Sequence, residues 1–229
     1  MISQCYASGM HVGHELLYEV AGSQGKRMRL DVLHLQQSPL DRSCGLTCVL
    51  MAAMLVSGLP RDYATSVAWT NRRELKKLWA VARVGYFRGT APASIARYLN
   101  IVCKGTKAIA VTGLPRELFA AVVEGLERDN VSLVLIGASE KSQLHWVLVT
   151  GVEYETRRRS SETNQRGRDV PIALLGLDPE SPAPICSAFN WRLPKHDGRA
   201  KPRDGIDTTR EREEYRQLQR AVVLHRSHD

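Results

Sequence analysis

The sequence predicts an α+β fold in which a helical half packs against an antiparallel β-sheet. Two observations lead to this prediction. After residue 43 the chain holds apolar, helix-favouring runs with clear boundary signals, and from residue 131 onward it holds short β-branched runs separated by polar turns. Helices therefore precede strands, instead of alternating with them as in a parallel α/β protein.

The length and composition are those of one globular domain. A chain of 229 residues can bury a sizeable core, and its hydrophobic fraction of 43% and charged fraction of 24% exclude disordered and fibrous classes. We expect an irregular N-terminal lead-in over residues 1–26. A single domain is expected over residues 27–229, with charged insertions near 155–169 and 192–214.

The helices are predicted from apolar runs and their ends. The run CGLTCVLMAAMLVSG follows Ser43 and stops at Gly58 and Pro60, so Cys44 is expected at a helix N-terminus, with Ser43 or Asp41 available as the cap. Further helices are expected over 61–70, 73–84, 92–99 and 115–128, and a charged helix near 210–219.

The strands are predicted from β-branched runs and period-two alternation. They are expected over residues 27–35, 131–138, 145–154, 171–179 and 221–225. His145 begins one of them and Asp178 lies at the end of the next. If these two strands pair in an antiparallel manner, the start of one lies beside the end of the other, and His145 and Asp178 become neighbours.

Charge and cysteine content bound the partners and the compartment. The net charge of +8 is concentrated near residues 157–168 and 192–203, which form either solvated loops or a docking surface for an acidic protein. No nucleic-acid motif occurs, so that partner is not expected. Five cysteines, an odd and sparse set, fit a reducing cytoplasm. No bilayer-spanning run and no Sec signal is present, which predicts a cytoplasmic protein or one exported without a Sec signal, with no membrane contact.

Cys44 is the candidate nucleophile. A thiolate is the reactive form of cysteine, and the unpaired N–H groups at a helix N-terminus stabilise it. Gly45 is expected to leave room for a substrate. Gln37, on the preceding loop, and the Cys44 backbone N–H can both donate to the oxyanion that forms when a thiolate attacks a carbonyl.

His145 is the candidate base, because it alone among seven histidines begins a strongly apolar strand beside a turn. A histidine base needs an acceptor on its second ring nitrogen, and Asp178 is expected to supply it. Cys44 and Cys48 could in principle chelate a metal, but no partner pair of cysteines or histidines at zinc-ligand spacing accompanies them, so neither a metal nor a cofactor is expected. Cys48, one helical turn after Cys44, is expected to belong to the core.

The segments QSPLDRSCGLTCVLMAAML, LHWVLVTGV and LLGLDP resemble the papain-superfamily peptidases of the bacteriocin leader-processing type. The resemblance covers residues 29–179. It implies a stand-alone papain-like cysteine peptidase with Cys44 as nucleophile, His145 as base, Asp178 as the orienting acid and Gln37 at the oxyanion. It also implies a protein or peptide substrate with small residues at the cleavage site.

Several alternatives remain open at this point. Gln36 competes with Gln37 because the glutamine-to-cysteine spacing is slightly long, and Asn190, before Trp191, competes with Asp178 as the orienting residue. The same triad serves deamidation or acyl transfer as well as hydrolysis of a peptide or isopeptide bond. A papain-like binding module with a dispensable triad is a further alternative.

Overall fold

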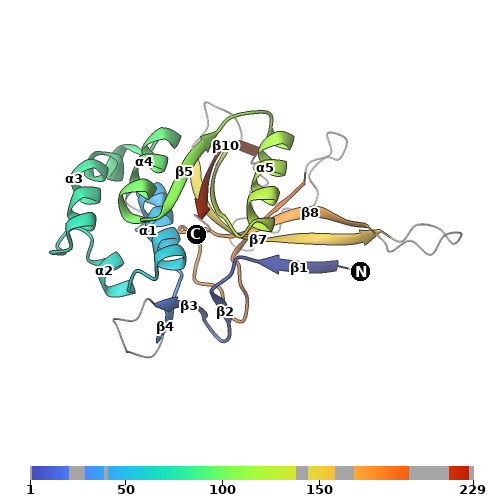
Figure 1. The fold of residues 1–229 in the computed structure, drawn as a ribbon, viewed down its shortest axis with the longest axis horizontal. Helices are drawn as coiled ribbons and strands as arrows, with labels where there is room; N and C mark the ends of the chain where they lie inside the picture. The colour runs from blue at the N-terminus through green and yellow to red at the C-terminus, as the bar shows by residue number, and fades with distance from the viewer. Residues whose placement is uncertain are drawn as a thin grey trace, which may run out of the picture.

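A seven-stranded antiparallel sheet forms the centre of the computed structural model, which describes residues 2–20, 29–38, 41–137, 144–157, 168–195 and 217–226 (Figure 1). Its strands, in spatial order, are β5 (Thr106–Val111), β10 (Gln217–Arg226), β6 (Val131–Gly137), β7 (His145–Arg157), β8 (Arg168–Leu177) and β9 (Trp191–Pro194), and β1 (Ile2–Tyr6) also pairs with β7. Every one of these pairings is antiparallel. The α+β fold class is therefore confirmed.

Helices cover both faces of this sheet (Figure 1). One group consists of α1 (Cys44–Ser57), α2 (Arg61–Thr65), α3 (Arg73–Arg88) and α4 (Pro92–Val102), and the opposite face carries α5 (Pro115–Glu127). In β6, Leu133 and Leu135 belong to the core on the α1 side, whereas Val134 and Ile136 belong to the core under α5. Burial on both faces explains why this strand is apolar apart from Ser132 instead of alternating with polar residues.

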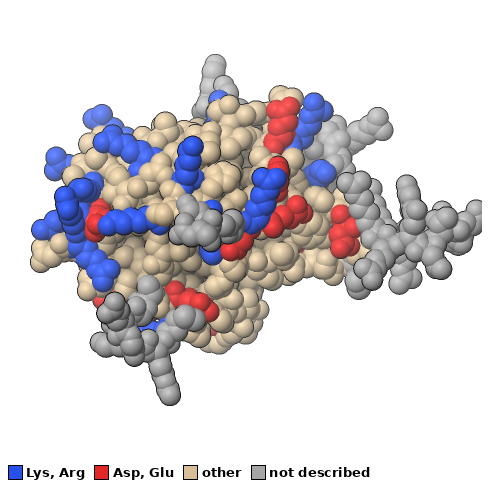
Figure 2. All heavy atoms as spheres, viewed as in Figure 1, with Lys and Arg blue, Asp and Glu red and all other residues tan. Residues whose placement is uncertain are grey.

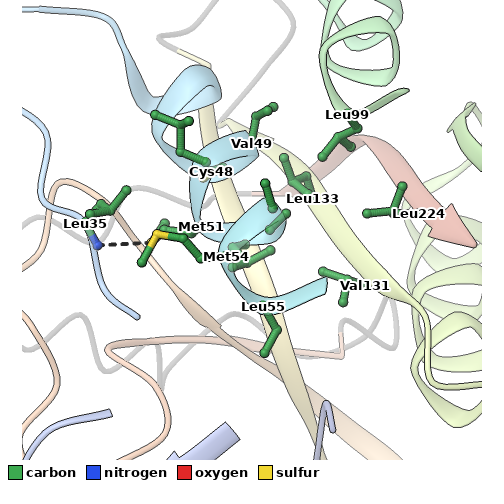
Figure 3. Packing of buried hydrophobic residues seen from close by; sticks show 14 of the residues in the cluster. Leu35, Cys48, Val49, Met51, Met54, Leu55, Leu99, Val131, Leu133 and Leu224 are labelled. Atoms are coloured by element: carbon green, nitrogen blue, oxygen red, sulfur yellow. Dashed lines mark hydrogen bonds between the residues drawn. The ribbon is translucent and has the colours of Figure 1, made fainter. Parts of the chain in front are cut away.

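Helix α1 lies in the middle of the larger core. All of its residues from Cys44 to Leu55 are buried, which accounts for a sequence that is apolar on every side. Figure 3 shows Leu99 of α4, Leu133 of β6 and Leu224 of β10 packed around it. The helix ends where Gly58 takes a left-handed conformation, with φ of 58°, as its sequence predicts.

The prediction of an irregular N-terminal lead-in is wrong for residues 2–20. Besides β1 it contains β2 (Met10–Val12) and β3 (Leu16–Val20), which form a small antiparallel sheet with β4 (Arg29–Val32). Leu16, Tyr18 and Val20 are buried in alternation, so β3 carries the period-two pattern that identifies a strand. Residues 21–28 lie outside the described residues.

Other predicted boundaries also shift. Strand β5 was not predicted, α2 is shorter than residues 61–70, and the predicted helix near 210–219 is wrong over 217–219, where β10 begins. Pairing of Gln217 and Leu218 with Gly137 and Ile136 of β6 overrides the local preference of this segment. Residues 155–157 and 168–169, assigned to a charged insertion, instead extend the β7–β8 pairing. Residues 192–194, assigned to the second insertion, instead form part of β9, and the remaining parts of the insertions at 158–167 and 196–214 lie outside the described residues.

Gly176 gives a test of the β7–β8 pairing. A Cβ at this position would lie 2.6 Å from the carbonyl oxygen of Leu148 and 2.9 Å from Trp191 Cε3. Because a backbone atom cannot yield without moving the strand, Gly176→Ala is expected to lower the free energy of unfolding by about 1 to 3 kcal/mol in urea denaturation. Gly13→Ala is the matched control, since its Cβ would meet nothing closer than 3.7 Å and should change stability by less than about 0.5 kcal/mol. Equal effects of the two substitutions would contradict the packing argument.

Candidate active site

Cys44 is the first residue of α1, and a network around Asp41 fixes the loop that leads to it. The Asp41 carboxylate accepts hydrogen bonds from the Ser43 backbone N–H at 2.9 Å, from Ser43 Oγ at 2.5 Å and from the Tyr86 hydroxyl at 2.9 Å. Ser43 occupies the N-cap position, but its side chain caps no helical N–H group. The N–H groups of the first turn therefore face the Cys44 end of the helix without a side-chain cap.

Gly45 serves packing and does not have the role expected from the sequence. A Cβ there would lie 3.0 Å from Ile95 Cδ1, 3.1 Å from Thr90 Cβ and 3.1 Å from Trp146 Cδ1. Trp146 is itself held in place by a hydrogen bond from its Nε1 to the Thr90 carbonyl at 2.8 Å. The space beside Gly45 is thus filled by protein side chains, and the expectation that it admits a substrate is wrong.

His145 and Asp178 are neighbours, as the antiparallel pairing predicts. Leu148 of β7 faces Leu177 of β8, so the start of β7 lies beside the residue that follows β8. His145 Nε2 lies 2.7 Å from Asp178 Oδ1, and both side chains are more than nine-tenths buried. A hydrogen bond of this length between an imidazole and a buried carboxylate fixes the orientation of the ring.

The surroundings of His145 favour its protonated form. Burial by itself lowers the pKa of His145, but its hydrogen bond to the Asp178 carboxylate, together with the negative charge of Asp178 and the interaction with Cys44, raises the pKa to about 10. With Nε2 occupied by Asp178, Nδ1 is the ring nitrogen left for Cys44. The arrangement can hold an imidazolium beside a thiolate.

Cys48 has a different environment from Cys44 although only one helical turn separates them. Its side chain is fully buried and its thiol donates to the Trp146 carbonyl oxygen, with a sulfur-to-oxygen distance of 3.4 Å. Burial raises the pKa of the Cys48 thiol well above its usual value. Cys48 therefore stays a neutral thiol in the core, as expected from the sequence.

Asn190 does not orient His145, but it holds the residue that does. The Asp178 backbone N–H donates to Asn190 Oδ1 at 2.7 Å, and Asn190 Nδ2 donates to the carbonyl oxygens of Asp178 at 3.1 Å and Pro182 at 2.8 Å. His34 Nε2 lies 3.1 Å from the same Asp178 carbonyl. Of the two residues that the sequence offers as the orienting residue, Asp178 contacts His145 directly, whereas Asn190 holds the backbone of Asp178.

The structure distinguishes the two candidate oxyanion residues. Gln36 is exposed, whereas Gln37 is buried and is bound to the turn after β8. The Gln37 backbone N–H donates to the Pro179 carbonyl at 2.9 Å, and Gln37 Nε2 donates to Glu180 Oε1 at 3.1 Å. Gln37 is therefore the glutamine that lies near the turn beside His145, and its oxyanion role remains a prediction.

Glu180 was not identified from the sequence. Its carboxylate contacts Gln37, its Oε1 lies 3.7 Å from His145 Nδ1, and its side chain is 27% exposed. A glutamate in a loop two residues after Asp178 has no pattern that distinguishes it from any solvated charge. Only the packing of this turn against the Gln37 loop reveals its position.

The wider surface gives no further candidate site. The described part of the chain has no group of three or more His, Cys, Asp or Glu side chains placed to hold a metal ion. In the same residues no helix has the length and apolar character needed to cross a bilayer.

Lys and Arg side chains gather over α3 and α4 at the helical end, whereas elsewhere on this face they are mixed with Asp and Glu (Figure 2). The basic stretches near 157–168 and 192–203 lie mostly outside the described residues, and Arg192 Nε is bound to Glu153 at 3.0 Å.

Comparisons of this chain with known protein families, with curated proteins and with solved structures give no match. The site is therefore interpreted from its own geometry.

The titration of His145 is the first prediction from this geometry. In NMR spectra of protein with isotopically labelled histidine, the His145 imidazole should be doubly protonated at pH 8 and should lose a proton near pH 10. Because the folded-state pKa is raised, protonation of His145 contributes stability that is fully present below about pH 6.5 and is lost as the pH rises through about 10. Asp178→Asn should lower the pKa of His145. A His145 transition near 6.5 in the wild type would contradict the paired arrangement.

Removal of the Asn190 side chain is the second prediction. Asn190→Ala leaves the buried Asp178 N–H without its acceptor, so the free energy of unfolding should fall by about 1 to 3 kcal/mol. The pKa of His145 should fall too, because Asp178 is held less firmly. Asn130→Ala is the control, since Asn130 is also buried and accepts from the Arg226 N–H at 3.0 Å away from this site. Asn130→Ala should destabilise the protein without changing the pKa of His145. If the pKa of His145 is the same in Asn190→Ala and Asn130→Ala, Asn190 does not have the role assigned to it.

Proposed function

We propose that this chain is a papain-like cysteine peptidase that hydrolyses a peptide or isopeptide bond in a protein or peptide. The observation that carries the proposal is the arrangement at the start of α1. Cys44 lies at a helix N-terminus and helps to raise the pKa of His145, and His145 Nε2 lies 2.7 Å from a carboxylate oxygen of buried Asp178. A thiol, a base and an acceptor that fixes the base are the parts required for nucleophilic catalysis by cysteine.

The proposed reaction has two steps. The Cys44 thiolate attacks the substrate carbonyl carbon, and the Cys44 backbone N–H and Gln37 Nε2 stabilise the oxyanion. The C–N bond then breaks as His145 gives its proton to the leaving amine, which leaves a thioester on Cys44. In the second step His145 takes a proton from water, the resulting hydroxide attacks the thioester, and the carboxylic acid is released as the thiolate re-forms.

The papain-like assignment is supported by the position of each group in the fold. The nucleophile begins a buried helix that packs on one face of an antiparallel sheet, and the base and its acid come from two neighbouring strands of that sheet. The order Gln37, Cys44, His145, Asp178 along the chain matches the order in the peptidase family that the sequence resembles. The same thioester can be formed from a side-chain amide or resolved by an amine, so deamidation and acyl transfer use the same machinery.

Selective alkylation tests the nucleophile. At pH 6, iodoacetamide should modify Cys44 at least about tenfold faster than exposed Cys5 and Cys186, because only a paired thiolate persists at that pH. Buried Cys103, whose pKa burial raises to about 12, should not react. His145→Ala should remove the advantage of Cys44, whereas Asn130→Ala should not. Mass spectrometry of the alkylated peptides gives the rates, and equal rates at Cys44, Cys5 and Cys186 would exclude the enzyme.

Mass spectrometry of a candidate proteome identifies the reaction. Incubation with the wild type, but not with Cys44→Ala, should generate new peptide termini. Side-chain mass shifts without new termini would instead assign a deamidase or transferase. A Cys44→Ala sample identical to the wild type, with selective alkylation intact, would contradict catalysis on these substrates and favour a binding module.

A further inference from the structure

Glu180 lies where the oxyanion donor and the base come closest. Its Oε1 accepts a hydrogen bond from Gln37 Nε2 at 3.1 Å and lies 3.7 Å from His145 Nδ1. Its backbone N–H donates to Asp178 Oδ1 at 2.8 Å, the same oxygen that contacts His145 Nε2. One residue thus contacts the side chains of Asp178 and Gln37 and lies close to His145.

The side-chain amide of Gln37 can face two ways, and only one of them is useful for an oxyanion. Nε2 donates hydrogen bonds, whereas Oε1 only accepts them and would repel an oxyanion. In the structure Gln37 Oε1 is buried and has no hydrogen-bond partner among the described residues. A buried carbonyl without a donor is unfavourable by about 1 to 3 kcal/mol, so some other contact must hold the amide in this orientation.

The Glu180 carboxylate supplies that contact. An ionised carboxylate only accepts hydrogen bonds, so Gln37 must present Nε2 to it. If the amide turned over, Gln37 Oε1 would face a Glu180 oxygen about 3.1 Å away, and two acceptors at that distance repel each other. The main chain of Gln37 is held by the same turn, through its N–H bond to the Pro179 carbonyl. The first N–H of the amide points to Glu180, and the second remains for another acceptor.

We propose that Glu180 is a positioning residue that fixes the orientation of the Gln37 side-chain amide, so that the second N–H of Nε2 is available to the oxyanion. This inference rests on the proposed function. The turn that carries Asp178 would then orient the base through one residue and the oxyanion donor through another. Glu180 itself contacts no reacting atom.

The test compares two reactions of Cys44 that differ only in whether an oxyanion forms. Iodoacetamide is attacked by the thiolate in a single displacement: a C–S bond forms, iodide leaves, and no tetrahedral oxyanion appears. With p-nitrophenyl acetate the thiolate adds to the carbonyl, the oxyanion collapses, the C–O bond breaks and p-nitrophenolate leaves, giving acetyl-Cys44. Both rates are measured at their pH-independent plateaus, after the Cys44→Ala background is subtracted.

Glu180→Gln is expected to slow acetylation of Cys44 by about tenfold or more, because glutamine can donate to Gln37 Oε1 and so permits the amide to turn over. Alkylation by iodoacetamide should change by less than about twofold. Glu180→Asp, which keeps an acceptor-only carboxylate, should lose less acetylation than Glu180→Gln. In a Gln37→Ala background, Glu180→Gln should have no further effect, since the group that it positions is absent.

Three results would overturn the proposal. Acetylation that is unchanged or faster in Glu180→Gln would mean that the carboxylate is neutral or obstructive. If the rates of acetylation and alkylation fall equally, Glu180 acts on His145 and not on the oxyanion donor. A fall that persists in the Gln37→Ala background would make it independent of Gln37. Failure of the proposed function gives a different result, since wild-type Cys44 would then show no selective alkylation. If Glu180→Gln does not fold, the acetylation rates of Glu180→Asp and Gln37→Ala still provide the comparison. The proposal is rejected if both variants acetylate Cys44 as fast as the wild type does.

Discussion

Strands β7 and β8 pair in a register in which Leu148 faces Leu177, and the positions of the candidate base and its orienting acid follow from it. This register puts the first residue of β7, His145, beside Asp178, which follows the last residue of β8. It also turns Trp146 and Leu148 toward the core around α1. A slip of one residue would exchange the side chains that β7 presents to the two cores, which would misfit the packing on both faces and separate His145 from Asp178. The apolar packing on both faces of the sheet therefore also enforces the geometry of the site.

The turn after β8 joins otherwise distant parts of the chain. Asp178 donates a hydrogen bond to Asn190 and accepts one from it, and the turn binds the Gln37 loop through Pro179 and Glu180. Buried polar groups that are mutually satisfied hold one arrangement firmly, because each partner that leaves exposes another to a desolvation penalty. The site thus owes its rigidity to a polar network outside the three residues that carry the proposed reaction.

Cys44 and Cys48 show how strongly environment decides the chemistry of a side chain. Both are buried cysteines of α1, one turn apart. Cys48 is surrounded by apolar side chains and a carbonyl, so its thiol stays neutral. Cys44 instead begins the helix, where no side chain caps the N–H groups of the first turn, and it helps to raise the pKa of His145. A cysteine count alone would not separate the two.

Local patterns in the sequence determined the order of helices and strands, the start of α1 at Cys44, and the strand ends at which His145 and Asp178 lie, since periodicity and boundary residues act within a few positions. The same pattern was present in β3 and was overlooked, whereas the strand at 217–219 depends on its central place in the sheet and not on its own residues. Only the tertiary structure distinguished Gln37 from Gln36 and gave Asp178 and Asn190 their separate positions. It also brought Glu180 between Gln37 and His145. These outcomes depend on contacts between segments far apart in the chain, and such contacts are fixed by how the sheet pairs and packs, which no local pattern encodes.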